Sequence, residues 1–119
     1  MDNIDMPQII SGLLNIEENM DHFKWEELRE GIEIYQIYEE TNDGPSAALL
    51  RYSAGASVPL HLHTGFEHIL ILAGTQTDGV NEYSKGMLMI SEPGSQHRIT
   101  SEAGCIALAI WQAPVKFSG

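Results

Sequence analysis

The chain has 119 residues, of which 17 are Asp or Glu and 6 are Lys or Arg, so its formal net charge is −11 at pH 7. This length holds one domain with a core of its own, and the hydrophobic content of 43% is close to that of a soluble globular protein. The acidic balance disfavours binding of nucleic acid, and the single cysteine excludes an intrachain disulfide and a zinc site made of several thiolates.

The acidic charge lies mainly in the first third of the chain, which also has helical patterns. Residues 1–43 carry 12 acidic and 2 basic side chains. Over residues 7–30 the apolar positions recur at helical spacing, and the second of two short patterns, Asp21–Arg29, is broken by Gly31. We therefore predict a helical extension over residues 1–30. Its acidic surface is either a solvated face or a docking surface for a basic partner.

Neither a targeting segment nor a membrane span is visible in the sequence. The first basic residue is Lys24, so the positively charged start of a signal peptide is missing. The longest apolar run, Cys105 to Trp111, has only seven residues. We expect a cytoplasmic protein that binds no membrane.

From Ile32 onward the hydrophobic period changes to two, which is typical of β-strands. Short strand-like segments follow, separated by glycine turns, at residues 47–53, 58–63, 67–73, 75–78, 83–91, 97–100 and 105–112. No helix after residue 44 is long enough to connect parallel strands. The pattern predicts an all-β sandwich or barrel over residues 31–119.

Four of the five histidines lie between residues 61 and 97, and three of them form a pattern with one glutamate. His61 and His63 are two residues apart on a predicted strand, so their imidazoles face the same way. Glu67 opens the next strand after a short turn and can return to that face, and His97 follows a Pro-Gly turn thirty residues later. Three neutral imidazoles and a carboxylate on rigid strands predict a site for one divalent ion, and Fe, Zn, Mn and Ni all fit these ligands. Metal affinity should fall below about pH 6, because the imidazoles must be neutral.

Strand alternation predicts what surrounds this site. The face of Glu67 continues as an apolar pocket wall made of Ile69, Ile71, Ala73 and Ile99. The opposite face carries His68, Leu70 and Leu72. The two leucines need a cover, which is either the N-terminal helices or a second subunit.

Few cations are available to bind a ligand in the predicted barrel, where Arg51, Lys85 and Arg98 are the only ones before Lys116. A phosphorylated ligand is therefore disfavoured, and a small neutral or singly charged organic molecule that chelates the metal fits better. Arg51 is either an anchor for a carboxylate or enolate or a structural salt-bridge partner. Cys105 lies in an apolar run and is interpreted as a small buried residue rather than a nucleophile.

The spacing of these residues resembles the two motifs of the cupin superfamily. The first motif is matched at every fixed position by Gly55, His61, His63, Glu67 and Gly74. The second is matched by Gly86, Gly94 and His97, whereas Glu92 stands where cupins have a proline. Over residues 24–116 the chain is similar to ChrR-type cupin domains. The positions that carry this likeness are 49–52, Gly55-Ala56, Gly74-Thr75, Asp78, Tyr83, Gly86 and Gly104-Cys105.

This resemblance implies a double-stranded β-helix, a homodimer, and His61, His63, Glu67 and His97 as ligands of the ion. ChrR-type cupins occur alone, as dioxygenases, or fused behind an anti-sigma domain with its own Cys/His zinc site. Residues 1–23 hold only His22 and no cysteine, so anti-sigma activity is not expected of them.

Three hypotheses follow from the site. The first is a metal-dependent dioxygenase acting on a small enolisable or diketone-like substrate. The second is a non-catalytic regulatory cupin, in which a bound metal or ligand alters a protein interface. The third is a structural metal site without turnover.

Overall fold

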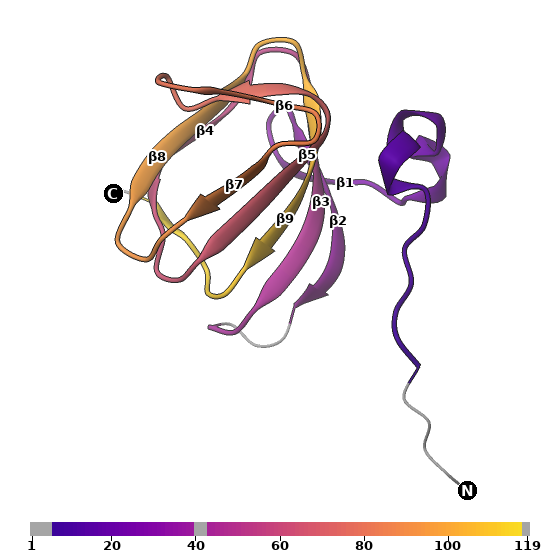
Figure 1. Cartoon of the computed structure of the whole chain (residues 1–119), viewed down its shortest axis with the longest axis horizontal. Helices are drawn as coiled ribbons and strands as arrows, with labels where there is room; N and C mark the ends of the chain where they lie inside the picture. Colours follow the sequence, from indigo (N-terminus) through magenta and orange to yellow (C-terminus); the bar gives the residue numbers. More distant parts are fainter. Residues whose placement is uncertain (1–5, 40–42, 118–119) are drawn as a thin grey trace, which may run out of the picture.

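The computed structural model describes residues 6–39 and 43–117, which form two short 3-10 helices followed by one curled antiparallel sheet (Figure 1). The elements are η1 Leu13–Glu18, η2 Met20–His22, β1 Glu26–Arg29, β2 Ile32–Glu39, β3 Ser46–Tyr52, β4 Ala56–Leu62, β5 Glu67–Thr77, β6 Glu82–Ser84, β7 Leu88–Ser91, β8 Gln96–Ser101, β9 Cys105–Trp111 and β10 Lys116–Phe117. The predicted all-β fold, a double-stranded β-helix with a short N-terminal helical segment, is confirmed. Within the described residues, no helix is long and apolar enough to cross a bilayer.

The sheet curls because β5 belongs to both of its halves. The first part of β5 pairs with β7 and β9, in a half ordered β1-β2-β3-β9-β5-β7. Its last residues pair with β6 and β8, and β8 continues through β4 to β10. Gly74 lies at this corner with φ +72°. The two strands expected at 67–73 and 75–78 are therefore one bent strand.

One other predicted strand was wrong in its extent. Residues 83–91 form two strands, β6 and β7, separated by a turn in which Gly86 has φ +91°. A single strand could not make this reversal, because a positive φ takes the backbone out of the extended region.

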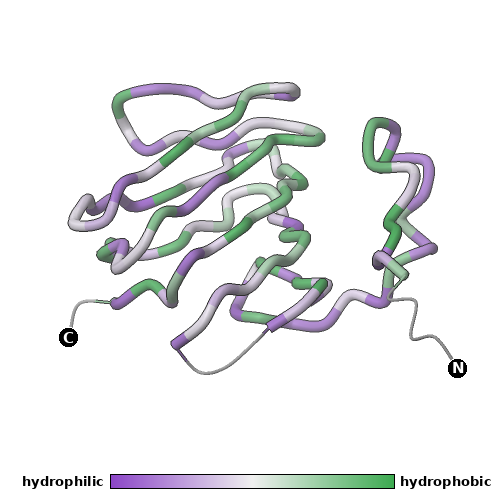
Figure 2. Tube along the Cα trace, turned by 60° about the horizontal axis from the view of Figure 1, so that its bottom comes forward, coloured by the Kyte–Doolittle hydropathy of each residue, from purple (hydrophilic) through white to green (hydrophobic). Residues whose placement is uncertain are grey.

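Alternation of side chains along the strands places one apolar set inside the curl. Hydrophobic and hydrophilic residues alternate along much of the sheet in Figure 2. The inner cluster includes Ile32, Leu50, Ile69, Ile71 and Ile99, all less than 9% exposed. The predicted inward orientation of the last three is confirmed.

The N-terminal segment is less helical than its sequence pattern indicates. Among its described residues only the two 3-10 helices form. Glu26–Arg29, predicted as helix, is strand β1, which pairs with β2 across Gly31. The acidic residues here have adequate helix propensity, but pairing with β2 satisfies the backbone of β1, and tertiary contacts routinely override propensity. Figure 1 shows the 3-10 helices outside the curled sheet.

This segment covers the outer apolar face of the sheet. Ile16 and Phe23, 1% and 9% exposed, pack in a second cluster with Leu49, Leu72 and Ile106. Leu70 is partly buried against the same cluster. Of the two covers expected for Leu70 and Leu72, the N-terminal segment is the one observed.

A shift of register in β5 changes the face of one predicted pocket residue. Between Ile71 and Ala73 the pairing with β9 slips by one residue. A bulge of this kind reverses the alternation that follows it. Ala73 therefore packs in the outer cluster with Leu72 rather than on the pocket wall, and that prediction was wrong.

The N-terminal cover gives a first test of the fold. Ile16→Ala should lower the free energy of unfolding by about 2–4 kcal/mol, because it removes a buried side chain and leaves a cavity. Leu14→Ala is a matched control from the same 3-10 helix, since Leu14 is 84% exposed, and should change stability by less than about 0.5 kcal/mol. Urea denaturation of both variants measures the difference. Equal losses would show that the segment does not pack as described.

Candidate metal centre

Three elements bring the four predicted site residues together. His61 lies near the end of β4, directly opposite His97 on β8, and His63 follows β4. Glu67 begins β5. One ligand atom from each residue lies within 4.8 Å of the others, so the four side chains converge on one place where small adjustments would let them share an ion.

The loop that returns the chain from β4 to β5 is tied at both ends. The Phe66 amide donates to the Gln112 Oε1, and the Gln112 amide donates to the Phe66 carbonyl, both at 2.9 Å. The His63 amide donates to the Ser95 carbonyl at 2.9 Å. These bonds join the loop to the segment before β8 and to the segment after β9. Hydrogen bonds to both segments therefore fix the positions of His63 and Glu67.

The histidine rings are oriented by hydrogen bonds on the nitrogen that faces away from the centre. The His61 Nδ1 lies 2.8 Å from the Pro59 carbonyl, and the His63 Nδ1 lies 3.0 Å from the Ser95 carbonyl. A carbonyl only accepts, so each Nδ1 carries a proton, and the neutral ring of His61 presents an unprotonated Nε2. The Nε2 of His63 instead faces the carboxylate of Glu67. A hydrogen bond on the outer nitrogen is the arrangement in which proteins hold metal-binding imidazoles.

Glu67 is the centre of the cluster. Its Oε1 lies 3.1 Å from the His63 Nε2 and 3.5 Å from the His97 Nε2. Its Oε2 accepts a 2.7 Å hydrogen bond from the indole nitrogen of Trp111. In the sequence Trp111 is only the last residue of an apolar run, and no local signal links β9 to β5, so its role in orienting the carboxylate was not predicted.

Burial and mutual contact shift the titration of the site. Desolvation lowers the pKa of His97 to about 4 and also lowers the pKa of His61, so both rings are neutral at pH 7. Desolvation acts the same way on His63, but the hydrogen bond and charge of Glu67 outweigh it and raise its pKa. Burial opposes the charge of Glu67, yet its contacts with His63 and Trp111 leave the pKa of the carboxyl below its usual value. Glu67 is thus anionic beside two neutral imidazoles, and His63 would lose the proton that it shares with Glu67 when a divalent cation binds.

A cavity of about 430 Å³ opens beside the four residues. His61, Glu67 and His97 line it, together with apolar side chains of both sheet halves: Ile34, Leu50, Val58, Ile69 and Ile99. A cavity of this size and lining suits a small, mostly apolar molecule.

The remaining predicted residues lie away from the cavity. Arg51 forms an ion pair with Glu33 at 3.2 Å and lies over the Trp25 ring, which supports the salt-bridge interpretation rather than the anchor. His68 lies beside Phe66, their ring centroids 6.4 Å apart, and does not join the metal cluster. Cys105 is buried, and burial raises the pKa of its thiol, which agrees with an unreactive residue.

Arg29 is the cation that does line the cavity. Arg29 falls in the pattern predicted as a helix of the extension, so it was not among the predicted barrel cations. The signal that could have found it is the short β-hairpin pattern in which Gly31 connects Glu26–Arg29 to the strand starting at Ile32.

Comparison with known proteins agrees with this architecture. The sequence profile of the ChrR cupin-like domain matches residues 15–114. The anti-sigma-E factor ChrR of Cereibacter sphaeroides is 30% identical over 105 residues, which are 87% of this chain and 48% of that protein. The chain therefore spans about half the length of this curated relative.

Solved structures show the same fold. The complex of Rhodobacter sphaeroides SigE with the anti-sigma factor ChrR matches with a TM-score of 0.67 and 26% identity, over 77% of this chain and 50% of that one. An acetylacetone dioxygenase from Acinetobacter johnsonii matches with a TM-score of 0.75 and 15% identity, over 100% of this chain and 85% of that one. The second likeness is one of fold alone.

Proposed function

We propose, from the premise that this chain belongs to the ChrR cupin-like domain family, that it binds one divalent metal ion and uses it to oxygenate a small enolisable or diketone-like compound. The observation that carries the proposal is the meeting of three imidazoles and one carboxylate within 4.8 Å, at the wall of an apolar cavity. His61, His63, Glu67 and His97 would hold the ion. Fe, Zn, Mn and Ni all suit these ligands.

The chemistry of the donors supports an ion in this place. The Nδ1 of His61 is already bonded to a carbonyl, so its Nε2 lone pair is free. The Nε2 of His63 shares a proton with Glu67 and would give it up to bind the ion. A bound ion supplies Lewis acidity and, when it is redox-active, the electron transfer that dioxygen needs.

The residues of the chain have separate tasks around the ion. The imidazoles and Glu67 fix its place, Trp111 holds the second oxygen of Glu67, and the apolar wall excludes bulk water from the ligand. A ligand with two adjacent oxygens would fit beside His61 and His97, since both rings face the cavity.

Oxygen uptake tests the catalytic proposal. The purified protein is analysed for its native metal, then loaded with Fe(II), Mn(II), Ni(II) or Zn(II) and supplied with a panel of β-diketones and flavonols. We expect at least one redox-active ion to give oxygen consumption matched by loss of substrate, and His97→Ala to abolish it. Absence of uptake with every ion and substrate would contradict a dioxygenase.

The second candidate is a regulatory cupin without turnover. Kinship with an anti-sigma factor and the 12 acidic residues among the first 43 support a role in which a bound metal or ligand alters a protein interface. A native zinc content, together with ligand binding but no oxygen uptake, would favour this function over the first.

The homodimer and the cytoplasmic location stay predictions. Leu88 and Ile90 on β7 are 56% and 54% exposed, and they are the side chains that we expect a second copy to cover.

A further inference from the structure

Two polar side chains of the cavity have no part in holding the ion. Arg29 on β1 is paired with Ile32 on β2, and Ile32 is paired with Tyr52 on β3. Residues directly opposite one another in an antiparallel sheet project from the same face. All three line the cavity, so Arg29 and Tyr52 lie on either side of Ile32 with their polar groups on the cavity side.

Neither polar group has an acceptor in the part of the chain that the structure describes. The ion pairs formed there are those of Arg51, His63 and His97, and none involves Arg29. The Tyr52 side chain is only 6% exposed and its hydroxyl bonds to no described residue. Every fully buried side-chain nitrogen or oxygen among the described residues has a hydrogen-bond partner. Because the Tyr52 hydroxyl has none, it is not fully buried and reaches the cavity surface. Burial raises the pKa of Tyr52, and the phenol therefore keeps its proton and can donate it to a hydrogen bond.

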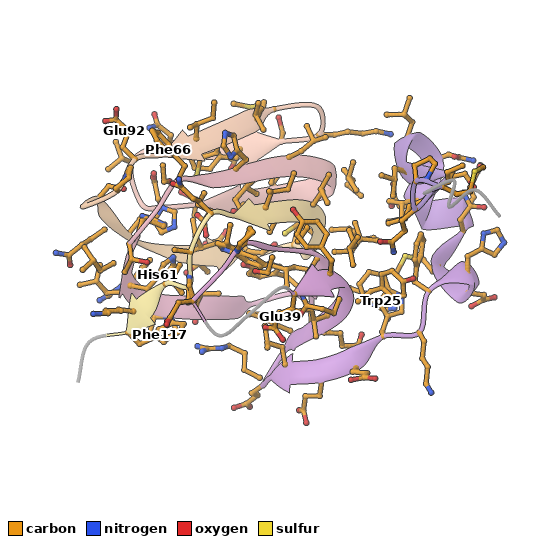
Figure 3. The ribbon with its side chains drawn as sticks, turned by 90° about the horizontal axis from the view of Figure 1, so that it is seen from below. Trp25, Glu39, His61, Phe66, Glu92 and Phe117 are labelled. Atoms are coloured by element: carbon orange, nitrogen blue, oxygen red, sulfur yellow. The ribbon has the colours of Figure 1, made fainter. Side chains whose placement is uncertain are left out.

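An aromatic ring holds Arg29 near the metal centre without neutralising it. The guanidinium carbon lies 4.7 Å from the centroid of the Phe117 ring, and that ring lies 5.7 Å from the ring of His61. Phe117 and His61 are paired between β10 and β4, and Figure 3 shows them together. A cation–π contact orients the guanidinium but leaves its hydrogen-bond donors available.

The charges of the cavity are separated along its length. Glu39, the other acidic lining residue besides Glu67, is at the far end of β2, roughly 23 Å along the strand from Ile32. Figure 3 shows Glu39 apart from His61 and Phe117. The end that contains Arg29 and Tyr52 also holds Glu67, whose charge a bound ion would offset, and Arg29 is the cationic side chain among the described lining residues. The wall between this end and Glu39 is mostly apolar.

We propose that Arg29 and Tyr52 recognise the carboxylate of a small, largely apolar monocarboxylic acid. A guanidinium and a phenol are strong donors to a single carboxylate, whereas one cation would not suit a polyanion. The inference rests on the proposed function in one respect, because the same ligand would also bind the metal ion. Both residues are specificity-determining, and neither is assigned a part in the chemistry.

Calorimetric titration with hexanoate and hexanamide tests the proposal, because the two probes share an alkyl chain and differ in charge. Zinc-loaded protein and protein stripped with EDTA are both titrated. We expect the wild type to prefer hexanoate on the order of tenfold or more in both forms. Arg29→Met should remove the preference, and Tyr52→Phe, which deletes one hydroxyl, should reduce it severalfold. Arg51→Met is the matched control and should leave it unchanged, since Arg51 lies outside the cavity.

The outcomes separate this proposal from the proposed function. Equal affinity for the two probes, or a preference that survives both Arg29→Met and Tyr52→Phe, overturns the inference. A preference that disappears only when zinc is removed also overturns it, since the ion would then bind the carboxylate, and leaves the metal function standing. A preference that depends on Arg29 in a protein that fails to bind zinc during loading supports the inference and contradicts the metal function. Tyr52→Phe keeps the test decisive should Arg29→Met fail to fold.

Discussion

Replacing His97 with alanine is expected to weaken zinc binding more than a hundredfold, while the apo protein keeps its fold. Loss of an outer partner of a metal ligand typically costs about 10–100-fold in affinity, and loss of a ligand itself should exceed that. His97 is the cleanest of the four to change, because its ring has a single polar contact with the residues that the structure describes, the 3.5 Å approach to Glu67. Its pKa of about 4 means that the neutral ring is already present at pH 7 and that no charge is removed.

His68→Ala is the matched control for this measurement. His68 also lies on a strand of the sheet, one residue after Glu67, but outside the metal cluster. Its removal should leave zinc affinity within about twofold, since no ligand or outer partner is lost. Competition against a fluorescent chelator gives both constants. Similar losses for His97→Ala and His68→Ala would show that the ion, if any, is bound elsewhere.

Trp111→Phe should fall between these two variants in the same assay. The ring and its packing are kept, but the hydrogen bond to the Glu67 Oε2 is lost. We expect a loss on the order of tenfold, the effect of an outer partner. A wild-type affinity in this variant would mean that packing alone orients Glu67.

Much of the site could be predicted from the sequence because its geometry is local. His61 and His63 share a face by strand parity, and a three-residue turn is short enough to return Glu67 to them. His97 is a different case, because no local rule pairs β8 with β4. Its place in the cluster followed from the spacing of the second cupin motif, which reflects the whole fold.

The features that were missed depend on contacts between distant segments. Glu26–Arg29 has a helix-like composition, and only its pairing with β2 makes it a strand that brings Arg29 to the cavity. The bulge near Leu72 lies where β5 leaves its pairing with β9, and it places Ala73 on the other face of the sheet. Nothing in the sequence around Ala73 predicts this change of face. Trp111 is read as core by composition, and its bond to Glu67 appears only when β9 and β5 are placed side by side.

Gly74 is the point at which this arrangement is most vulnerable, and Gly74→Ala is expected to destabilise the protein by about 2–5 kcal/mol. Its φ of +72° disfavours any side chain by roughly 1–2 kcal/mol. A Cβ atom would also clash with the Gly104 carbonyl oxygen and lie 2.8 Å from the Cα of Cys105, both on the neighbouring chain segment. Relief of that overlap requires backbone movement, which costs about 1–3 kcal/mol more.

Gly79→Ala isolates the steric part of this effect. Gly79 has φ +94°, so alanine is strained there too, but no atom lies within 4 Å of the added Cβ. We expect a loss of about 1–2 kcal/mol from this variant in urea denaturation. Equal losses for the two variants would show that close packing against Gly104 does not matter. A larger loss at Gly74 should be accompanied by weaker zinc binding, because β5 carries Glu67 in one half of the sheet and turns at Gly74 to pair with β8, which carries His97, in the other.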